Sequence, residues 1–234
     1  MVGFSDFNKY YQILIAKNRK RNLLLRKKSY RHLDITKPMV ALTFDDGPHP
    51  IYTQRILETL TKYKSVATFF MLGTRAEAYP NQVNLVNTQG SQIGNHSWDH
   101  KQLTKLNSID VKNEVSNTQR AVYNATKKVP EIIRPPYGSI NTELKQQLNM
   151  PIILWNIDTQ DWKSKNTASI VSKALENVQD GDIILMHDIY KTTADAVPYI
   201  ITELKSRGFE LVTITELLSN KGSVLQNNTT YTRR

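Results

Sequence analysis

Residues 39–48 read Met-Val-Ala-Leu-Thr-Phe-Asp-Asp-Gly-Pro, an apolar run that stops at two carboxylates. The run from Met39 to Phe44 is typical of a strand buried in a parallel sheet. Asp45 and Asp46 follow it directly, and Gly-Pro supplies a turn. Functional residues of α/β folds gather at the carboxyl ends of parallel strands. The stretch therefore predicts a buried strand that carries two acidic side chains to a functional edge.

Six further apolar runs follow, each paired with an amphipathic stretch in units of about 25–30 residues, as strand–helix pairs are. The predicted strands are 39–44, 66–70, 92–95, 131–133, 152–157, 182–186 and 209–214. The predicted helices are 52–63, 76–88, 109–126, 141–148, 167–178, 193–207 and 214–219. Seven such units require a parallel sheet covered by helices, either doubly wound or closed into a regular or distorted barrel. Periodicity alone does not choose between these architectures.

The composition indicates one globular domain of enzyme-like character. A chain of 234 residues with 39% hydrophobic and 22% charged residues is neither a disordered nor an integral membrane protein by composition. It contains no cysteine, which excludes disulfides, thiolate metal sites and thiol nucleophiles. The longest early apolar run, residues 13–16, is too short for a signal-peptide core. If the protein is exported, we expect its export segment to be absent from this chain.

The net charge of +10 is concentrated near the amino terminus. Residues 1–38 hold ten of the 31 Lys and Arg residues but only two of the 21 Asp and Glu residues. We expect a basic arm at 1–36, helical and attracted to an anionic membrane or wall polymer. A solvated helix that packs on the domain through residues 23–25 is an equal alternative. Nucleic acid is not an expected partner, because no recognition motif or aromatic stacking platform accompanies the charge.

Unusual polar residues follow five of the predicted strands. The clusters are Thr43-Phe-Asp-Asp-Gly-Pro48, Asn95-His-Ser-Trp-Asp-His100, Arg134-Pro-Pro-Tyr-Gly138, Asp158-Thr-Gln-Asp-Trp162 and His187-Asp188. Because the carboxyl ends of parallel strands share one edge of a sheet or barrel, the five clusters predict one composite site.

Two histidines and a carboxylate in these clusters indicate a catalytic metal site. His96 and His100 lie four residues apart, which places both imidazoles on one face of a helical turn. With Asp46 they offer nitrogen and oxygen ligands that suit Zn²⁺, or alternatively Co²⁺, Mn²⁺ or Ni²⁺. Three protein ligands leave positions open for water and substrate. The structural alternatives are a satisfied histidine pair and, for Asp45 and Asp46, an ordinary surface turn.

Arg134, Asp161 and His187 are candidates for supporting roles at this site. A carboxylate–imidazole pair of Asp161 and His187 would fix the histidine tautomer and raise its pKa, which suits proton donation to a leaving amine. Arg134 could equally be a structural ion-pair partner, and His187 a buried, satisfied histidine.

Taken together, the five clusters resemble the motifs of the NodB-type polysaccharide deacetylases, carbohydrate esterase family 4, over about residues 37–220. The first two clusters are highly specific in combination, and the other three follow in the family's order. The resemblance implies an α/β fold with a distorted (β/α) barrel of seven to eight units. It also implies an enzyme that hydrolyses N-acetyl groups of amino sugars with one divalent metal ion, Zn²⁺ being the expected ion.

The resemblance further implies a role for each matching residue. Asp46, His96 and His100 would hold the metal. Asp45 would be the general base, oriented by Arg134, and His187 would protonate the departing amine, oriented by Asp161. The backbone N–H of Tyr137 would stabilise the oxyanion, and Trp162 with Leu185 would line the pocket for the acetyl methyl group.

The expected substrate is the N-acetylglucosamine of a cell-wall polysaccharide, peptidoglycan above all, and the expected location is extracellular or at the bacterial cell surface. The alternatives are chitooligosaccharide, another N-acetylglucosamine polymer or acetyl xylan. A non-catalytic sugar-binding domain is a further hypothesis, against which the complete set of site residues argues. We expect a catalytic domain at 37–220 and a polar tail at 221–234, disordered from Asn227 to Arg234.

Overall fold

The fold is built around strand β1 (Met39–Asp45), in which every residue is buried. The computed structural model describes residues 33–219 and 223–234. Within them, β1 pairs in parallel with β2 (Thr68–Met71) and with β6 (Ile183–His187). The first two residues of β1 pair instead with β7 (Glu210–Leu211). The predicted first strand is therefore confirmed, and it lies at the centre of the sheet.

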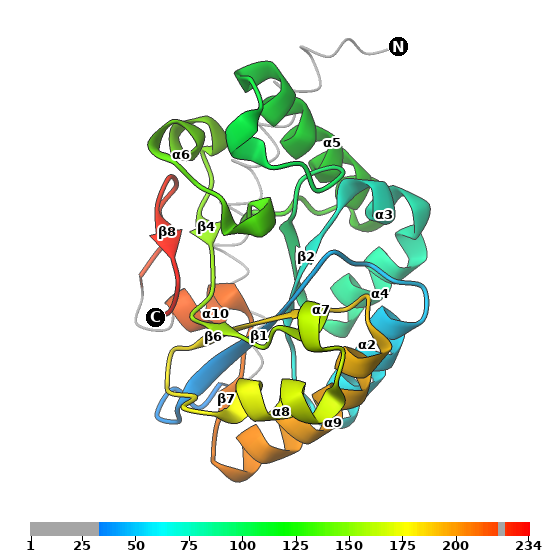
Figure 1. The fold of residues 1–234 in the computed structure, drawn as a ribbon, viewed down its shortest axis with the longest axis vertical. Helices are drawn as coiled ribbons and strands as arrows, with labels where there is room; N and C mark the ends of the chain where they lie inside the picture. Colours follow the sequence, from blue (N-terminus) through cyan, green and yellow to red (C-terminus); the bar gives the residue numbers. More distant parts are fainter. Residues whose placement is uncertain (1–32, 220–222) are drawn as a thin grey trace. The chain divides into compact units, whose positions relative to one another are not determined.

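The remaining strands extend this sheet on both sides (Figure 1). Its order is β3 (Gln92–Asn95), β2, β1, β6 and β5 (Ile157–Asp158), and all pairings are parallel. Strand β4 (Ile152–Ile153) pairs separately with β8 (Thr230–Tyr231). Single bridges join Asn95 to Ile133 and Ile133 to Ile152. The prediction of an α/β fold with a parallel sheet is confirmed.

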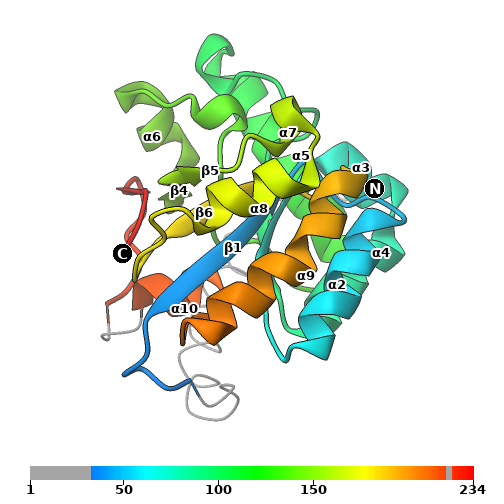
Figure 2. The same cartoon turned by 60° about the horizontal axis from the view of Figure 1, so that its bottom comes forward.

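Helices pack against the sheet and bury alternate residues of β1. Val40, Leu42 and Phe44 belong to a core shared with the helices, whereas Thr43 and Asp45 point to the other face. Figure 2 shows α9 alongside β1, between α2 and α8. The helices are α2 (Tyr52–Lys62), α3 (Gly73–Ala78), α4 (Pro80–Gln89), α5 (Ser108–Thr126), α6 (Thr142–Leu148), α7 (Asp161–Ser164), α8 (Thr167–Leu175), α9 (Lys191–Ser206) and α10 (Ile214–Ser219).

Three predicted elements differ in form from the prediction. The helix expected at 76–88 is two helices, because Pro80 begins α4 at the first helical position, where its ring and missing N–H are tolerated. The strand expected at 131–133 is reduced to the bridges of Ile133. The run at 152–157 divides into β4 and β5, with Leu154–Asn156 between them.

The prediction of a disordered tail from Asn227 to Arg234 is wrong. The amide of Ile152 donates to the carbonyl of Thr229 at 2.9 Å, and that of Leu154 donates to Tyr231 at 2.8 Å. Arg234 donates its backbone N–H to Gly181 at 2.8 Å and pairs its side chain with Asp180. A polar composition concealed this strand because its stability comes from backbone ladder bonds rather than from apolar burial.

The basic arm predicted at 1–36 lies almost entirely outside the described residues. Ile35–Arg234 form one compact unit. Among the described residues, no helix is both long and apolar enough to cross a membrane.

Removing residues 229–234 should lower the free energy of unfolding by on the order of 2 kcal/mol, because the ladder bonds to β4 contribute about 1 kcal/mol each. Urea unfolding followed by circular dichroism measures the change. Thr232→Ala is the matched control, since Thr232 is exposed and makes no hydrogen bond to another described residue. Equal stability of the truncated and full chains would contradict the structural role of β8.

Candidate functional site

The five polar clusters lie at the ends of strands or directly after them, as the sequence predicted. Several of their residues adopt left-handed backbone conformations: Asp46 (φ 71°), Ser97 (φ 68°), His100 (φ 68°), Tyr137 (φ 62°) and Gln160 (φ 51°). For residues other than glycine this conformation costs on the order of 1–3 kcal/mol and is concentrated at functional sites. The same conformation also occurs outside the clusters, as at Lys64 and Asn149, so it supports the assignment of the site only together with the side-chain geometry.

Asp46, His96 and His100 converge on one point. Their ligand atoms all lie within 4.8 Å of one another. Oδ1 of Asp46 is 3.4 Å from Nε2 of each histidine. This oxygen is buried and forms no hydrogen bond with any described residue. A buried carboxylate oxygen without a partner is costly, and a cation between it and the two nitrogens would remove the cost.

A hydrogen bond engages Nδ1 of His96 and leaves Nε2 available as a metal ligand. Nδ1 of His96 lies 2.7 Å from the carbonyl oxygen of Arg134, to which it donates. The lone pair then resides on Nε2, which faces Asp46. The ring of His100 is 5.1 Å from that of His96 and packs edge-on against Tyr137 at 4.6 Å. The donor set therefore fits a divalent metal ion.

Electrostatics keep Asp46 ionised. Burial alone would raise its pKa, but the neighbouring His96, followed by His187 and His100, lowers it to about 2. The carboxylate is thus available as an anionic ligand at any physiological pH.

Arg134 is fully buried and connects three clusters. Its Nη1 donates to Asp45 Oδ1 at 2.7 Å and to Thr43 Oγ1 at 2.8 Å. Nε and Nη2 donate to the carbonyls of Ile153 and Leu154. The guanidinium carbon also lies 4.2 Å from the ring centroid of Phe70. These contacts fix Asp45 Oδ1 and leave Oδ2, 3.7 Å from His96 Nε2, facing the metal-ligand cluster.

Asp161 and His187 form the predicted pair. Asp161 Oδ1 accepts from His187 Nδ1 at 2.7 Å, and Oδ2 accepts from the His187 amide and from Thr193, each at 2.7 Å. Burial alone would lower the pKa of His187, but the hydrogen bond and charge of Asp161 raise it to about 9, aided by Asp45 and Asp46. His187 is therefore protonated at neutral pH, with Nε2–H free to donate.

The three predicted substrate-binding residues have different settings. Tyr137 is 67% exposed beside His100, and Trp162 is 49% exposed, with its amide donating to Asp161. Leu185 is buried on β6, opposite Thr43. The elements that carry Trp162 and Leu185, α7 and β6, contact each other, and the acetyl pocket itself stays a prediction.

Sequence reasoning missed Glu114, a buried carboxylate of α5. Its Oε2 accepts from the amides of Trp98 at 2.8 Å and Asp99 at 3.3 Å, and its Oε1 pairs with Lys101. It therefore anchors the loop between His96 and His100. A glutamate within a helix resembles any solvated helical residue, so the sequence contained no usable signal.

Asp188 is a second missed residue, although it follows His187 directly. It is fully buried, accepts a hydrogen bond from Thr53, and lies where a Cβ at Gly47 would meet its carboxylate. Burial raises its pKa to about 7, despite the hydrogen bond from Thr53. Asp188 thus supports the turn after Asp46 and requires glycine at position 47.

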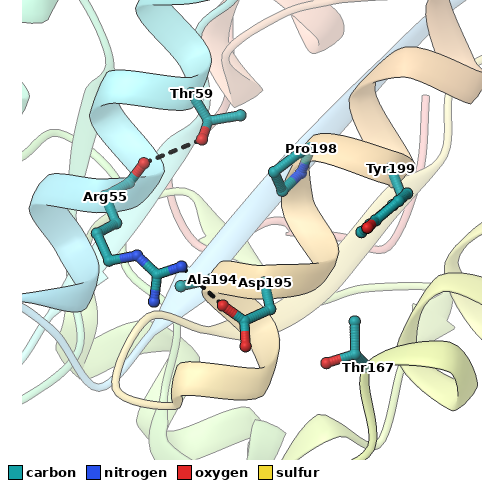
Figure 3. Close-up of a pocket in the computed structure, with 7 residues that line it drawn as sticks. All are labelled: Arg55, Thr59, Thr167, Ala194, Asp195, Pro198 and Tyr199. Atoms are coloured by element: carbon teal, nitrogen blue, oxygen red, sulfur yellow. Dashed lines mark hydrogen bonds and ion pairs between the residues drawn. The ribbon is translucent and has the colours of Figure 1, made fainter.

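A separate surface cavity of about 500 Å³ lies between α2, α8 and α9. Figure 3 shows the ion pair of Arg55 and Asp195 in it, with Tyr199 at its edge. None of the predicted site residues lines this cavity.

Glu114→Ala should weaken zinc binding about 10–100-fold, because residues that orient metal ligands typically contribute this much to affinity. Glu114→Gln keeps an acceptor and should cost less. Competition with a chromophoric chelator measures the dissociation constant. Lys101→Met, which leaves the carboxylate–amide bonds intact, is the control. Unchanged affinity in Glu114→Ala would refute the anchoring role.

In the metal-free protein, NMR titration of the His187 ring should give a pKa of about 9, and Asp161→Asn should move it down toward the ordinary 6.5. Because the folded-state pKa is the higher one, this pair stabilises the fold fully below pH 6.5 and loses its contribution as the pH rises through about 9. Asp158→Asn should leave the titration unchanged. A wild-type midpoint near 6.5 would be inconsistent with this coupling.

Similarity to known proteins agrees with this geometry. Residues 32–151 match the family model described as polysaccharide deacetylase. The peptidoglycan-N-acetylglucosamine deacetylase PgdA of Listeria monocytogenes is 45% identical over 186 residues, which cover 80% of this chain and 40% of that protein. The peptidoglycan-N-acetylmuramic acid deacetylase PdaC of Bacillus subtilis is 43% identical over 185 residues, 79% of this chain and 40% of that protein. The chain thus spans about two fifths of the length of these curated relatives.

Solved structures show the same likeness. Peptidoglycan deacetylase PdaC from Bacillus subtilis has a TM-score of 0.77 and 40% identity, covering 82% of this chain and 100% of that chain. A family 4 acetyl xylan esterase from Clostridium thermocellum, solved in complex with a cobalt ion, has a TM-score of 0.79 and 31% identity, covering 83% and 98% of the two chains. On the family match and these similarities, the chain belongs to the polysaccharide deacetylase family.

Proposed function

We propose that this protein is a metal-dependent deacetylase that hydrolyses N-acetyl groups of N-acetylglucosamine in peptidoglycan and releases acetate. The observation that carries the proposal is the buried, unpartnered Oδ1 of Asp46 between the Nε2 atoms of His96 and His100. Beside it lie a carboxylate held by Arg134 and an imidazole held by Asp161. Only a hydrolytic role uses all of these groups together.

The expected cofactor is one divalent ion, Zn²⁺ in the first place, with Co²⁺, Mn²⁺ or Ni²⁺ as alternatives. When bound by Asp46, His96 and His100, the ion would polarise the acetamide carbonyl and acidify a water molecule. The nitrogen and oxygen donor set and the open side of the cluster support this assignment.

The acid–base roles follow from which atoms are already engaged. Arg134 occupies Oδ1 of Asp45, so Oδ2 accepts the proton of the attacking water as its oxygen bonds to the acetyl carbon. Asp161 occupies Nδ1 of His187, so Nε2–H gives its proton to the amine as the carbon–nitrogen bond breaks. The raised pKa of His187, about 9, provides the protonated form at neutral pH.

The substrate-facing roles rest on the family resemblance. The Tyr137 amide would donate to the oxyanion, supported by the left-handed backbone of that residue. Trp162 and Leu185 would enclose the acetyl methyl group.

Peptidoglycan is favoured as the substrate because two of the similar proteins are named peptidoglycan deacetylases. We further propose an extracellular or cell-surface location in a bacterium, with the basic residues 1–36 contacting an anionic wall polymer or membrane. Chitooligosaccharide, another N-acetylglucosamine polymer and acetyl xylan are the alternatives that the assay below separates.

We also propose that the sheet closes into a distorted barrel within a catalytic domain that begins near residue 37. The bridges of Ile133 to Asn95 and Ile152 support closure, since they continue the sheet from β3 toward β4. The chain then runs from β4 into β5, which pairs with β6.

Asp45→Asn should lower kcat for acetate release about 10²–10⁴-fold, the usual contribution of a general base, while metal binding persists. Acetate release from peptidoglycan, N-acetylglucosamine oligomers and acetyl xylan would be measured for the metal-loaded enzyme, its chelated form and this variant. Asp158→Asn is the control carboxylate. Absence of acetate from every substrate despite bound metal would favour a sugar-binding protein instead.

A further inference from the structure

The start of α3, together with Leu72 before it, is hydrogen-bonded to both loops that carry the metal ligands. The amide of Leu72 donates to the carbonyl of Gly47, next to Asp46, at 3.0 Å. The amides of Gly73 and Thr74 donate to the carbonyls of Ser97 and Trp98, each at 3.0 Å. The next residue is Arg75, in the first turn of α3. Its backbone therefore lies against the edge of the site.

The side chain of Arg75 is half-buried and makes no hydrogen bond or ion pair within residues 33–219 and 223–234. Arg134 and Arg55 differ, because each pairs with a carboxylate at 2.7 Å. None of its nitrogens is among the buried unpartnered atoms of the described residues, so the guanidinium is accessible from solvent. Arg120 of α5 is also half-buried without such a bond, so what distinguishes Arg75 is its place beside both loops that carry the metal ligands. An unpaired guanidinium in that place can bind an anion of the substrate.

The charge of Arg75 acts on groups after β1 and β6. After burial, it is the second cause that lowers the pKa of His49. It also counteracts the burial that raises the pKa values of Asp188 and Tyr190. The ring of Tyr190 is 6.0 Å from that of His187 and has Lys165 Nζ 5.7 Å from its centroid. Arg75 and Lys165 thus provide positive charge on the side of the site that contains the proposed proton donor.

Arginine presents a planar fork of donors that matches a carboxylate in a bidentate geometry. Polymers made only of N-acetylglucosamine or xylose offer no carboxylate. Peptidoglycan offers carboxylates on the stem peptides, which the muramic acid residues carry next to N-acetylglucosamine. The lactyl carboxyl of muramic acid is free only where the stem peptide has been removed, because it otherwise forms the amide bond to that peptide. The unpaired guanidinium therefore has a chemical partner in only one of the candidate substrates.

We propose that Arg75 is a specificity-determining residue that binds a carboxylate of peptidoglycan while the neighbouring acetamido group occupies the metal site. This inference rests on the proposed deacetylase function and names the feature that selects its substrate. Lys165 adds a non-directional attraction at the same edge. The stem-peptide carboxylates and, on strands without peptides, the lactyl carboxylates share this chemistry, and the substrates of the test distinguish them.

The test compares wild type, Arg75→Met and Arg75→Lys on three substrates, with acetate release as the readout. The substrates are peptidoglycan strands with stem peptides, strands stripped of peptides by an amidase, and N-acetylglucosamine oligomers. Arg75→Met should lose about 10–100-fold in kcat/KM on peptidoglycan, mainly through KM, because one charge-assisted contact is removed. It should stay within about twofold of wild type on the oligomers. On peptidoglycan, the kcat/KM of Arg75→Lys should lie between those of wild type and Arg75→Met. The control is Arg120→Met, a change at a half-buried arginine of α5, which should resemble wild type.

Each outcome decides the proposal. A loss on intact strands assigns the stem-peptide carboxylates, and a loss on stripped strands assigns the lactyl carboxylate that the amidase sets free. An equal loss on oligomers would show that Arg75 merely supports the buried Asp188, and no loss on peptidoglycan would also overturn the proposal. Wild-type protein inactive on all three substrates would instead refute the deacetylase function on which the inference rests.

Discussion

The buried contact between Arg134 and Asp45 is the interaction on which the site depends. A charge pair removed from water is stable only when each partner's hydrogen-bonding groups are satisfied. Arg134 meets this condition by donating to Asp45, to Thr43 and to two carbonyls at the end of β4, those of Ile153 and Leu154. Its own carbonyl accepts from His96, so one residue orients both the proposed base and a metal ligand.

Neighbouring side chains of the site have widely different pKa values. Asp46 has a pKa lowered to about 2 and His187 a pKa raised to about 9, and each shift stabilises the charged form of the group. Burial opposes both shifts, so neighbouring charges of opposite sign must outweigh it. At Asp188, burial outweighs its hydrogen bond and the pKa rises to about 7. Burial alone therefore does not determine whether a group is protonated. The direction of its pKa shift depends on whether a neighbouring charge or hydrogen bond outweighs the effect of burial.

Much of this arrangement could be predicted from the sequence, because the chemistry coincides with strand ends. Asp45, Asp46 and His187 follow apolar runs that are typical of buried strands. Because these strands pair in parallel, their carboxyl ends lie side by side and bring the three residues together. Glu114 could not be predicted, since its partners are backbone amides of a loop whose shape the sequence does not encode locally. Strand β8 was hidden for the same reason, because ladder bonds have no side-chain signature. The division at Pro80, in contrast, was visible in the sequence and was overlooked.

The position of β1 also governs how the chain must fold. Its neighbour β6 lies far along the sequence, with Thr43 donating to the carbonyl of Ile184 across 141 positions. During synthesis β1 therefore has one edge without its partner until β6 has been made. Contacts this distant raise contact order and slow folding. An exposed apolar strand edge is meanwhile open to mispairing. The pairing of β1 with β6 thus delays the completion of the sheet until late in synthesis.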